Sequence, residues 1–142
     1  MNDQCFYRIS IKGIVIDSEG RILLTKEDND KWEMLGGGLD HGEDPLTCLK
    51  REIREETGLS LTKIYPVPKY FITSQRIDNS SYIANLIYRI ELKNLDFRPS
   101  DECQELRFFS LEDMKREYNN LFPNVQSLYN MLSKEVGNNF TP

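Results

Sequence analysis

Residues 51–58 have the sequence Arg-Glu-Ile-Arg-Glu-Glu-Thr-Gly, which places three carboxylates within five positions. In a helix, which turns by about 100° per residue, Glu52, Glu55 and Glu56 would share about a quarter of the circumference. Like charges at this spacing repel each other by roughly a few tenths of a kcal/mol. The crowding therefore favours a site for a positive charge. The alternative is an ordinary solvated helix face on which Arg51 pairs with Glu55.

The helix around these acids has clear boundaries. Asp44 is a favourable N-cap residue, Pro45 suits the first helical position, and Gly58 suits the position just past the end. Directly before it, residues 32–44 combine three consecutive glycines with acids and the only histidine of the chain, which predicts a loop with unusual backbone conformations. Magnesium ions are usually held by one or two carboxylates together with water and phosphate oxygens. Acids beside a glycine-rich loop therefore favour a metal site over a solvated face.

Strand patterns lie on both sides of this helix. The prolines Pro66 and Pro68 interrupt one of them, because proline has no amide hydrogen for a β-ladder. The predicted elements are a β-hairpin over residues 7–17 and 21–26, two strand regions between residues 60 and 93 with the clearer at 81–92, a last strand at 105–111 and a helix at 124–137.

Composition limits the class of protein. A chain of 142 residues with 39% hydrophobic content predicts a single domain over residues 1–142. The net charge of −5 argues against a general nucleic-acid coat and against a polybasic membrane anchor. Cys5, Cys48 and Cys103 show no CxxC spacing, so neither a disulfide framework nor a structural zinc site is expected. No signal peptide or membrane-spanning stretch is visible, which predicts a cytoplasmic protein.

The stretch from Gly37 to Leu59 resembles the signature of the Nudix hydrolases, which we call the Nudix box. That signature is a glycine, five residues, a glutamate, seven residues and then Arg-Glu-U-x-Glu-Glu-x-Gly-U, where U is a bulky aliphatic residue. Here Gly37 is followed after five residues by Glu43, and after seven more by residues 51–59. Every fixed position matches. Leu35 and Asp40 depart from residues that are common in the family, but both lie outside the fixed positions.

The resemblance implies a fold, a reaction and a cofactor. The fold would be the α/β/α sandwich of the family, with a central mixed β-sheet. The reaction would be metal-dependent hydrolysis of a pyrophosphate bond in a nucleoside diphosphate linked to another moiety, by attack of water on phosphorus. The cofactor would be Mg²⁺, with Mn²⁺ as a substitute, and the partner a small nucleotide derivative rather than a polymeric nucleic acid or a membrane.

The same resemblance assigns roles within the box. Glu52 and Glu56 would be direct metal ligands, Glu55 a ligand directly or through water, and the carbonyl of Gly37 a further ligand. Arg51 and Glu43 would form a structural pair between the helix and its loop, and Gly58 would end the helix. The general base stays open between a box glutamate and a later acid. Glu102 and Glu105 are the late candidates, and we favour Glu102.

The substrate is less defined than the reaction. Residues 121–124 resemble the stretch from which family members that hydrolyse nucleoside triphosphates present an asparagine to the purine, so Asn124 is a candidate base contact. ADP-ribose hydrolases commonly carry a proline some distance after the box, where this chain has residues 73–75, Thr-Ser-Gln. Some Nudix-like domains bind nucleotides without cleaving them, but their boxes are usually eroded, so the intact box favours a hydrolase. The sequence leaves homodimerisation open.

Overall fold

The computed structural model describes residues 4–137 of the chain. Its elements, in chain order, are β1 (Tyr7–Ile14), β2 (Ile22–Lys26), β3 (Trp32–Glu33), β4 (Leu35–Gly38), α1 (Pro45–Thr57), β5 (Leu61–Ile64), β6 (Tyr70–Gln75), β7 (Tyr82–Leu92), β8 (Glu105–Phe109), α2 (Leu111–Arg116), a 3₁₀ turn (Tyr118–Asn120) and α3 (Pro123–Gly137). The helix with the three acids, α1, therefore has the limits that its capping residues predicted.

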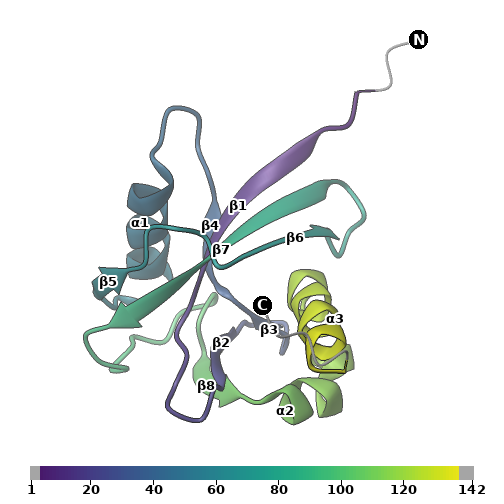
Figure 1. Ribbon diagram of the computed structural model, residues 1–142. Coiled ribbons are helices and arrows are strands. Elements are labelled where there is room, and N and C mark those ends of the chain that lie inside the picture. The colour runs from purple at the N-terminus through teal and green to yellow at the C-terminus, as the bar shows by residue number, and fades with distance from the viewer. Residues whose placement is uncertain (1–3, 138–142) are drawn as a thin grey trace.

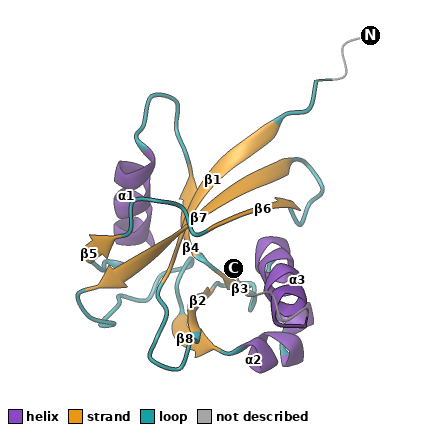
Figure 2. Ribbon diagram, viewed as in Figure 1, coloured by secondary structure: helices purple, strands orange, loops and turns teal. Residues whose placement is uncertain are grey.

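A mixed sheet forms the centre of the molecule. β1 pairs in parallel with the long strand β7 and antiparallel with β4, while β5 and β6 pair antiparallel with β7. A smaller sheet has the order β3-β2-β8. Figures 1 and 2 show α1 on one side of the strands and α3, with α2, on the other. This layering confirms the predicted α/β/α sandwich with a mixed central sheet.

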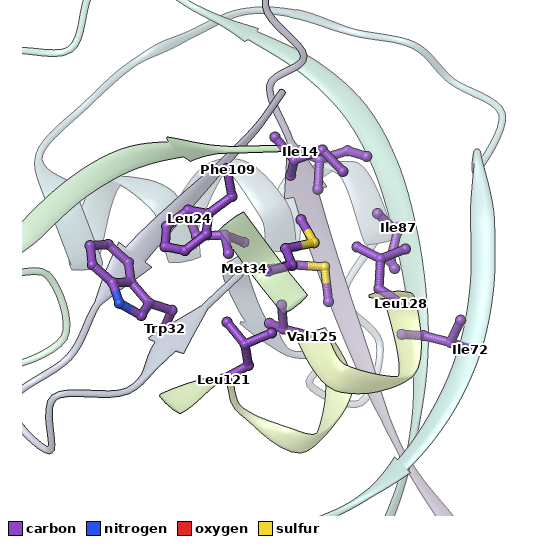
Figure 3. Close-up of a cluster of buried hydrophobic side chains, with 12 residues drawn as sticks. Ile14, Leu24, Trp32, Met34, Ile72, Ile87, Phe109, Leu121, Val125 and Leu128 are labelled. Carbon is purple, nitrogen blue, oxygen red and sulfur yellow. The ribbon is translucent and has the colours of Figure 1, made fainter. Parts of the chain in front are cut away.

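Two hydrophobic clusters fill the layers. In one, Val125 and Leu128 of α3 pack against strand residues such as Ile14, Ile72 and Ile87, as Figure 3 shows. In the other, the buried face of α1 packs on β1 and β7 through Cys48, Leu49, Ile53, Ile11, Tyr88 and Ile90. Each fully buried aliphatic side chain contributes about 1.5–3 kcal/mol. The second cluster fixes α1 against the sheet, and with α1 the position of its acids.

The hairpin predicted for residues 7–26 forms only at its turn. Ile16 and Ile22 make an isolated bridge, and the N–H of Leu23 donates to the carbonyl of Val15 (3.0 Å). Beyond the turn, β1 joins the mixed sheet and β2 joins the smaller one. The predicted hairpin is therefore present only at its turn, because β1 pairs with β4 and β7, and β2 pairs with β3 and β8.

Three further predictions differ from the structure. Residues 105–111 were expected to be one strand, but β8 ends at Phe109 and Ser110 starts α2 with a capping box to Asp113. The glycine stretch was expected to be a loop, but Leu35–Gly38 is the strand β4. The irregular strand around the prolines is two strands, β5 and β6, which flank residues 65–69.

The length of the helices and the state of the cysteines complete the description of the fold. Among the helices of residues 4–137, none has the length and apolarity needed to span a bilayer. Cys5 is exposed, whereas Cys48 and Cys103 are buried, and all three are free.

Candidate active site

Helix α1 carries the acids of the site, and a capping residue defines each of its ends. The side chain of Asp44 accepts hydrogen bonds from the N–H groups of Leu46 (3.1 Å) and Thr47 (3.2 Å). Gly58 ends the helix with a left-handed backbone, at φ 74°, which glycine adopts without strain. The buried face of α1 includes Ile53 and Glu56. One carboxylate is therefore carried into the interior together with the apolar side chains.

Two successive glycines of β4 let carboxylates approach the backbone. The N–H of Gly36 donates to Oε1 of Glu56 (2.8 Å). Gly36 has φ 120° and lies so close to the carbonyl of Ile11 that no Cβ would fit. A Cβ on Gly37 would lie 2.5 Å from the carboxyl carbon of Glu52. The glycines are therefore needed for space, and they bring Glu52 and Glu56 to neighbouring positions on one strand.

Arg51 connects the loop before α1 to the acids of the helix. Its guanidinium donates to both carboxylate oxygens of Glu43, at 2.8 and 2.9 Å, and this pairing lowers the pKa of Glu43 to about 2. The same side chain donates to Glu52 (2.9 Å) and to Glu55 (3.3 Å). Glu55 lies at the rim, with 59% of its side chain exposed. Bidentate pairs of this kind fix geometry, so Arg51 holds the loop, Glu52 and Glu55 in one arrangement.

Glu56 is a buried carboxylate with an unusual charge environment. It is 4% exposed, and burial raises its pKa to about 8. The ammonium of Lys12 and the N–H of Gly36 oppose this rise in pKa, whereas the charges of Glu33 and Glu102 add to it. A buried carboxylate is stable as an anion only when a positive charge compensates it. The environment of Glu56 is therefore suited to receive a cation.

Residues 6–131 match the sequence model of the NUDIX domain. The chain belongs to the Nudix family. Nudix proteins are generally dependent on divalent metal ions.

The Nudix relatives of this chain are named for different activities. The chain is 32% identical over 113 residues to a nucleoside triphosphatase, NudI, from Escherichia coli, and the match covers 70% of this chain and 80% of that protein. It is 25% identical over 112 residues to an ADP-ribose pyrophosphatase from Methanocaldococcus jannaschii, over 76% of this chain and 64% of that protein. In two further curated relatives that it matches, the chain spans 42% and 36% of their length.

Solved structures agree on the Nudix fold. The MutT protein from Methanosarcina mazei has a TM-score of 0.70 with this chain at 20% sequence identity, over 94% of this chain and 98% of that one. At this identity the likeness shows the fold alone. The arrangement of sheet and helices is thus that of a Nudix domain.

The residues of the Nudix box fit a hard divalent cation by the chemistry of their donors. The carboxylates of Glu52, Glu55 and Glu56 and the carbonyl of Gly37 are all oxygen ligands, which Mg²⁺ prefers. Within residues 4–137, no three His, Cys, Asp or Glu side chains are gathered closely enough to enclose a metal by themselves.

Glu102 reaches the site on the segment between β7 and β8. The hydroxyl of Ser100 donates to the backbone carbonyl of Glu56 (2.9 Å), and the hydroxyl of Thr25 donates to the carbonyl of Glu102 (3.2 Å). The segment is thus held from α1 and from β2. Glu102 is among the charges that raise the pKa of Glu56, whereas Glu105 lies on β8 and pairs with Arg107 (3.4 Å).

Three residues near the site were not identified from the sequence. Lys12 on β1 and Glu33 on β3 are both buried, with Nζ 3.7 Å from Oε2. Glu27 follows β2, and burial raises its pKa to about 7, with a further contribution from Glu33. The sequence offered one weak signal, a lysine between Ile11 and Gly13 at the apolar end of a strand. Glu27 and Glu33 lie in or beside a polar loop and look like surface acids.

Asn124, the candidate base contact, is buried at the start of α3. Its Nδ2 donates to Oδ1 of Asn85 (3.4 Å), and its Oδ1 accepts from the N–H of Val125 (2.9 Å). It lines a pocket of about 380 Å³ whose other residues are Asn29, Glu33, Ser74, Gln75, Arg76, Ile77, Asp78, Ile83, Phe122 and Pro123. Because Glu33 lines the pocket and also pairs with Lys12 beside Gly36, this pocket adjoins the acids of the Nudix box.

The raised pKa of Glu56 predicts how the stability of the metal-free protein depends on pH. Between pH 4.5, the ordinary value, and about 8, the folded protein holds a proton on Glu56 that the unfolded chain releases. Its unfolding free energy should therefore fall as pH rises through this window. Thermal melts in EDTA from about pH 5 to about pH 8.5 measure the slope. The variant Glu56→Gln should show a shallower slope, and equal slopes would contradict the assignment.

Proposed function

We propose that this protein is a magnesium-dependent Nudix hydrolase, a single domain over residues 1–142, that cleaves a pyrophosphate bond in a nucleoside diphosphate linked to another moiety. The observation that carries the proposal is the placement of two box carboxylates, Glu52 and Glu56, against the neighbouring glycines Gly37 and Gly36. The complete box supports hydrolysis rather than binding alone. Relatives named for ADP-ribose and nucleoside triphosphates support a nucleotide substrate.

The proposed mechanism assigns each box residue a task. Glu52 and Glu56, with Glu55 and the carbonyl of Gly37, would hold Mg²⁺ or, as a substitute, Mn²⁺. When bound, the ion would neutralise charge on the phosphate oxygens and make the attacking water a stronger nucleophile. Water forms a new bond to phosphorus, the bridging P–O bond breaks, and the leaving phosphate carries away the electron pair. Arg51 keeps Glu52 and Glu55 in place and takes no part in these bond changes.

The proton of the attacking water needs an acceptor, and we assign it to Glu102. Two observations support the assignment: the charge of Glu102 contributes to the raised pKa of Glu56, and the backbone of its segment is held by hydrogen bonds from Ser100 and Thr25. Replacing Glu102 with Gln should lower kcat by about 10²-fold or more, the usual range for loss of a general base. The rate of the wild type should rise from acid toward neutral pH, and this rise should flatten in the variant.

Two matched variants make the test specific. Glu105→Gln removes an acid three positions away that pairs with Arg107, and it should leave kcat within about twofold of the wild type. Glu27→Gln tests the other nearby acid, whose pKa of about 7 would also suit a base at neutral pH. A larger loss in Glu27→Gln than in Glu102→Gln would move the assignment to Glu27.

We place the base of the nucleotide in the pocket beside Asn124. Its amide has one N–H and one lone pair beyond those used by Asn85 and Val125, which suits the adjacent donor and acceptor of a nucleobase edge. The proposed function is tested by a screen of dinucleoside, nucleotide-sugar and triphosphate substrates with Mg²⁺, in which phosphate is measured with and without added pyrophosphatase or phosphatase. Binding of these compounds without release of phosphate from any of them would favour a nucleotide-binding regulator instead.

A further inference from the structure

A buried lysine lies beside the acids of the Nudix box. Lys12 faces Gly36 across the β1–β4 ladder, and its side chain is only 7% exposed. Its ammonium donates to the carbonyl of Gly36 (3.2 Å) and lies 3.7 Å from Oε2 of Glu33. Such burial leaves the ammonium little access to a substrate. Any effect of Lys12 on the site must therefore be exerted through its charge and its hydrogen bond.

The charges around Lys12 keep it protonated. Burial alone would lower its pKa, but the carboxylates of Glu33, Glu56, Glu27 and Glu52 together raise it above the usual value. One peptide connects it to the box, since the N–H of Gly36 donates to Glu56 while the carbonyl of the same residue accepts from Lys12. The positive charge of Lys12 thus lies close to several carboxyl groups of the site.

We propose that Lys12 is a resident counter-cation of the Nudix site, which compensates Glu33 in the metal-free protein and weakens divalent metal binding by repulsion. The affinity of the site for metal is then set by the charge balance of the Lys12–Glu33 pair. The inference rests on the proposed function only in that the box binds a divalent ion. Charges separated by a few ångströms in a partly buried site interact strongly enough to change a binding constant by an order of magnitude or more.

The test is a charge series measured with Mn²⁺ as the probe, by electron paramagnetic resonance of free and bound ion in the absence of substrate. Lys12→Met should bind Mn²⁺ roughly tenfold or more tightly than the wild type, because a repelling charge is lost. Glu33→Gln should bind it roughly tenfold or more weakly, because the charge of Lys12 is no longer balanced. The double variant restores the balance and should lie within about threefold of the wild type.

Melting temperatures in EDTA supply a second readout. Lys12→Met should melt lower than the wild type, because Glu33 is left buried without its cation, and the double variant should recover much of this loss. Lys63→Met is the matched control, since Lys63 is exposed on β5 and stacks over Tyr65. Its Mn²⁺ affinity should equal that of the wild type.

Each remaining outcome has a definite meaning. Unchanged or weaker binding in Lys12→Met overturns the inference. If Glu33 were itself a metal ligand, the double variant would stay as weak as Glu33→Gln, and this too overturns it. Should Lys12→Met fail to fold, the comparison of Glu33→Gln with the double variant decides alone. A wild type that binds no Mn²⁺ overturns both this inference and the proposed function, whereas metal-dependent hydrolysis without the predicted order of affinities overturns only the inference.

Discussion

Replacing Glu56 with Gln is expected to lower the rate of pyrophosphate hydrolysis by a factor on the order of 10² or more, as for removal of other preorganised charge-stabilising groups. Glu56 is the most deeply buried acid of the Nudix box, and its Oε1 is fixed by the N–H of Gly36 (2.8 Å). Glutamine keeps the size of the side chain and an oxygen for this hydrogen bond, but it removes the charge that would hold the metal.

The same variant should not weaken the metal-free fold. Burial raises the pKa of Glu56 to about 8, so at lower pH the metal-free side chain is neutral, and a neutral amide of the same size changes no charge. At a single pH well below about 8, where metal-free Glu56 holds a proton, thermal melts of wild type and Glu56→Gln, each with EDTA and with Mg²⁺, should therefore differ only in the response to metal. Glu112→Gln, an exposed acid on α2, is the control and should keep wild-type rates. A near-wild-type rate in Glu56→Gln would remove Glu56 from the metal site.

Removal of divalent metal is the second change with a large expected effect. Hydrolysis should fall to the detection limit in EDTA and return when Mg²⁺ or Mn²⁺ is added in excess. The physical reason is that the carboxylates Glu52, Glu55 and Glu56 would otherwise repel the negatively charged phosphates of the substrate. Rates measured after dialysis against EDTA, with stepwise return of metal, give the apparent affinity of the site.

The loss of activity in EDTA must be separated from unfolding. Both hydrophobic clusters are built from apolar side chains that require no metal, so circular dichroism should show the same secondary structure with and without EDTA. The melting temperature should rise with added Mg²⁺, because a ligand that binds the native state stabilises it by mass action. Full turnover in EDTA, after bound metal has been removed, would exclude the proposed mechanism.

Helix α1 was predictable because its determinants are local. Asp44, Pro45 and Gly58 act within one turn of the helix ends, and the spacing of Glu52, Glu55 and Glu56 on one side follows from helix geometry alone. The Nudix box is likewise a continuous stretch of chain. Both could be identified without knowing any tertiary contact.

The rest of the candidate site depends on contacts between distant segments. Lys12 meets Gly36 through the β1–β4 ladder, and Glu102 reaches α1 through Ser100. A single lysine in a strand ordinarily indicates a solvent-facing position, and nothing local to residue 12 shows that Glu33 and Glu56 surround it. The predicted hairpin is limited to its turn for the same reason, since β1 pairs along its length with β4 and β7. The missed helix α2 is different, because Ser110 and Asp113 do form a recognisable capping box.

The parallel ladder between β1 and β7 has a consequence for the order in which the protein becomes functional. It pairs Tyr7 with Tyr82 and Ile14 with Arg89, so a large part of the chain must be closed into a loop before these strands can join. Helix α1, by contrast, can form from local contacts as soon as it is synthesised. On a ribosome, the box helix should therefore appear early, while the cluster that buries its apolar face is completed only when Tyr88 and Ile90 of β7 have left the exit tunnel. Hydrolytic competence is then acquired late in translation, in one step with closure of the central sheet.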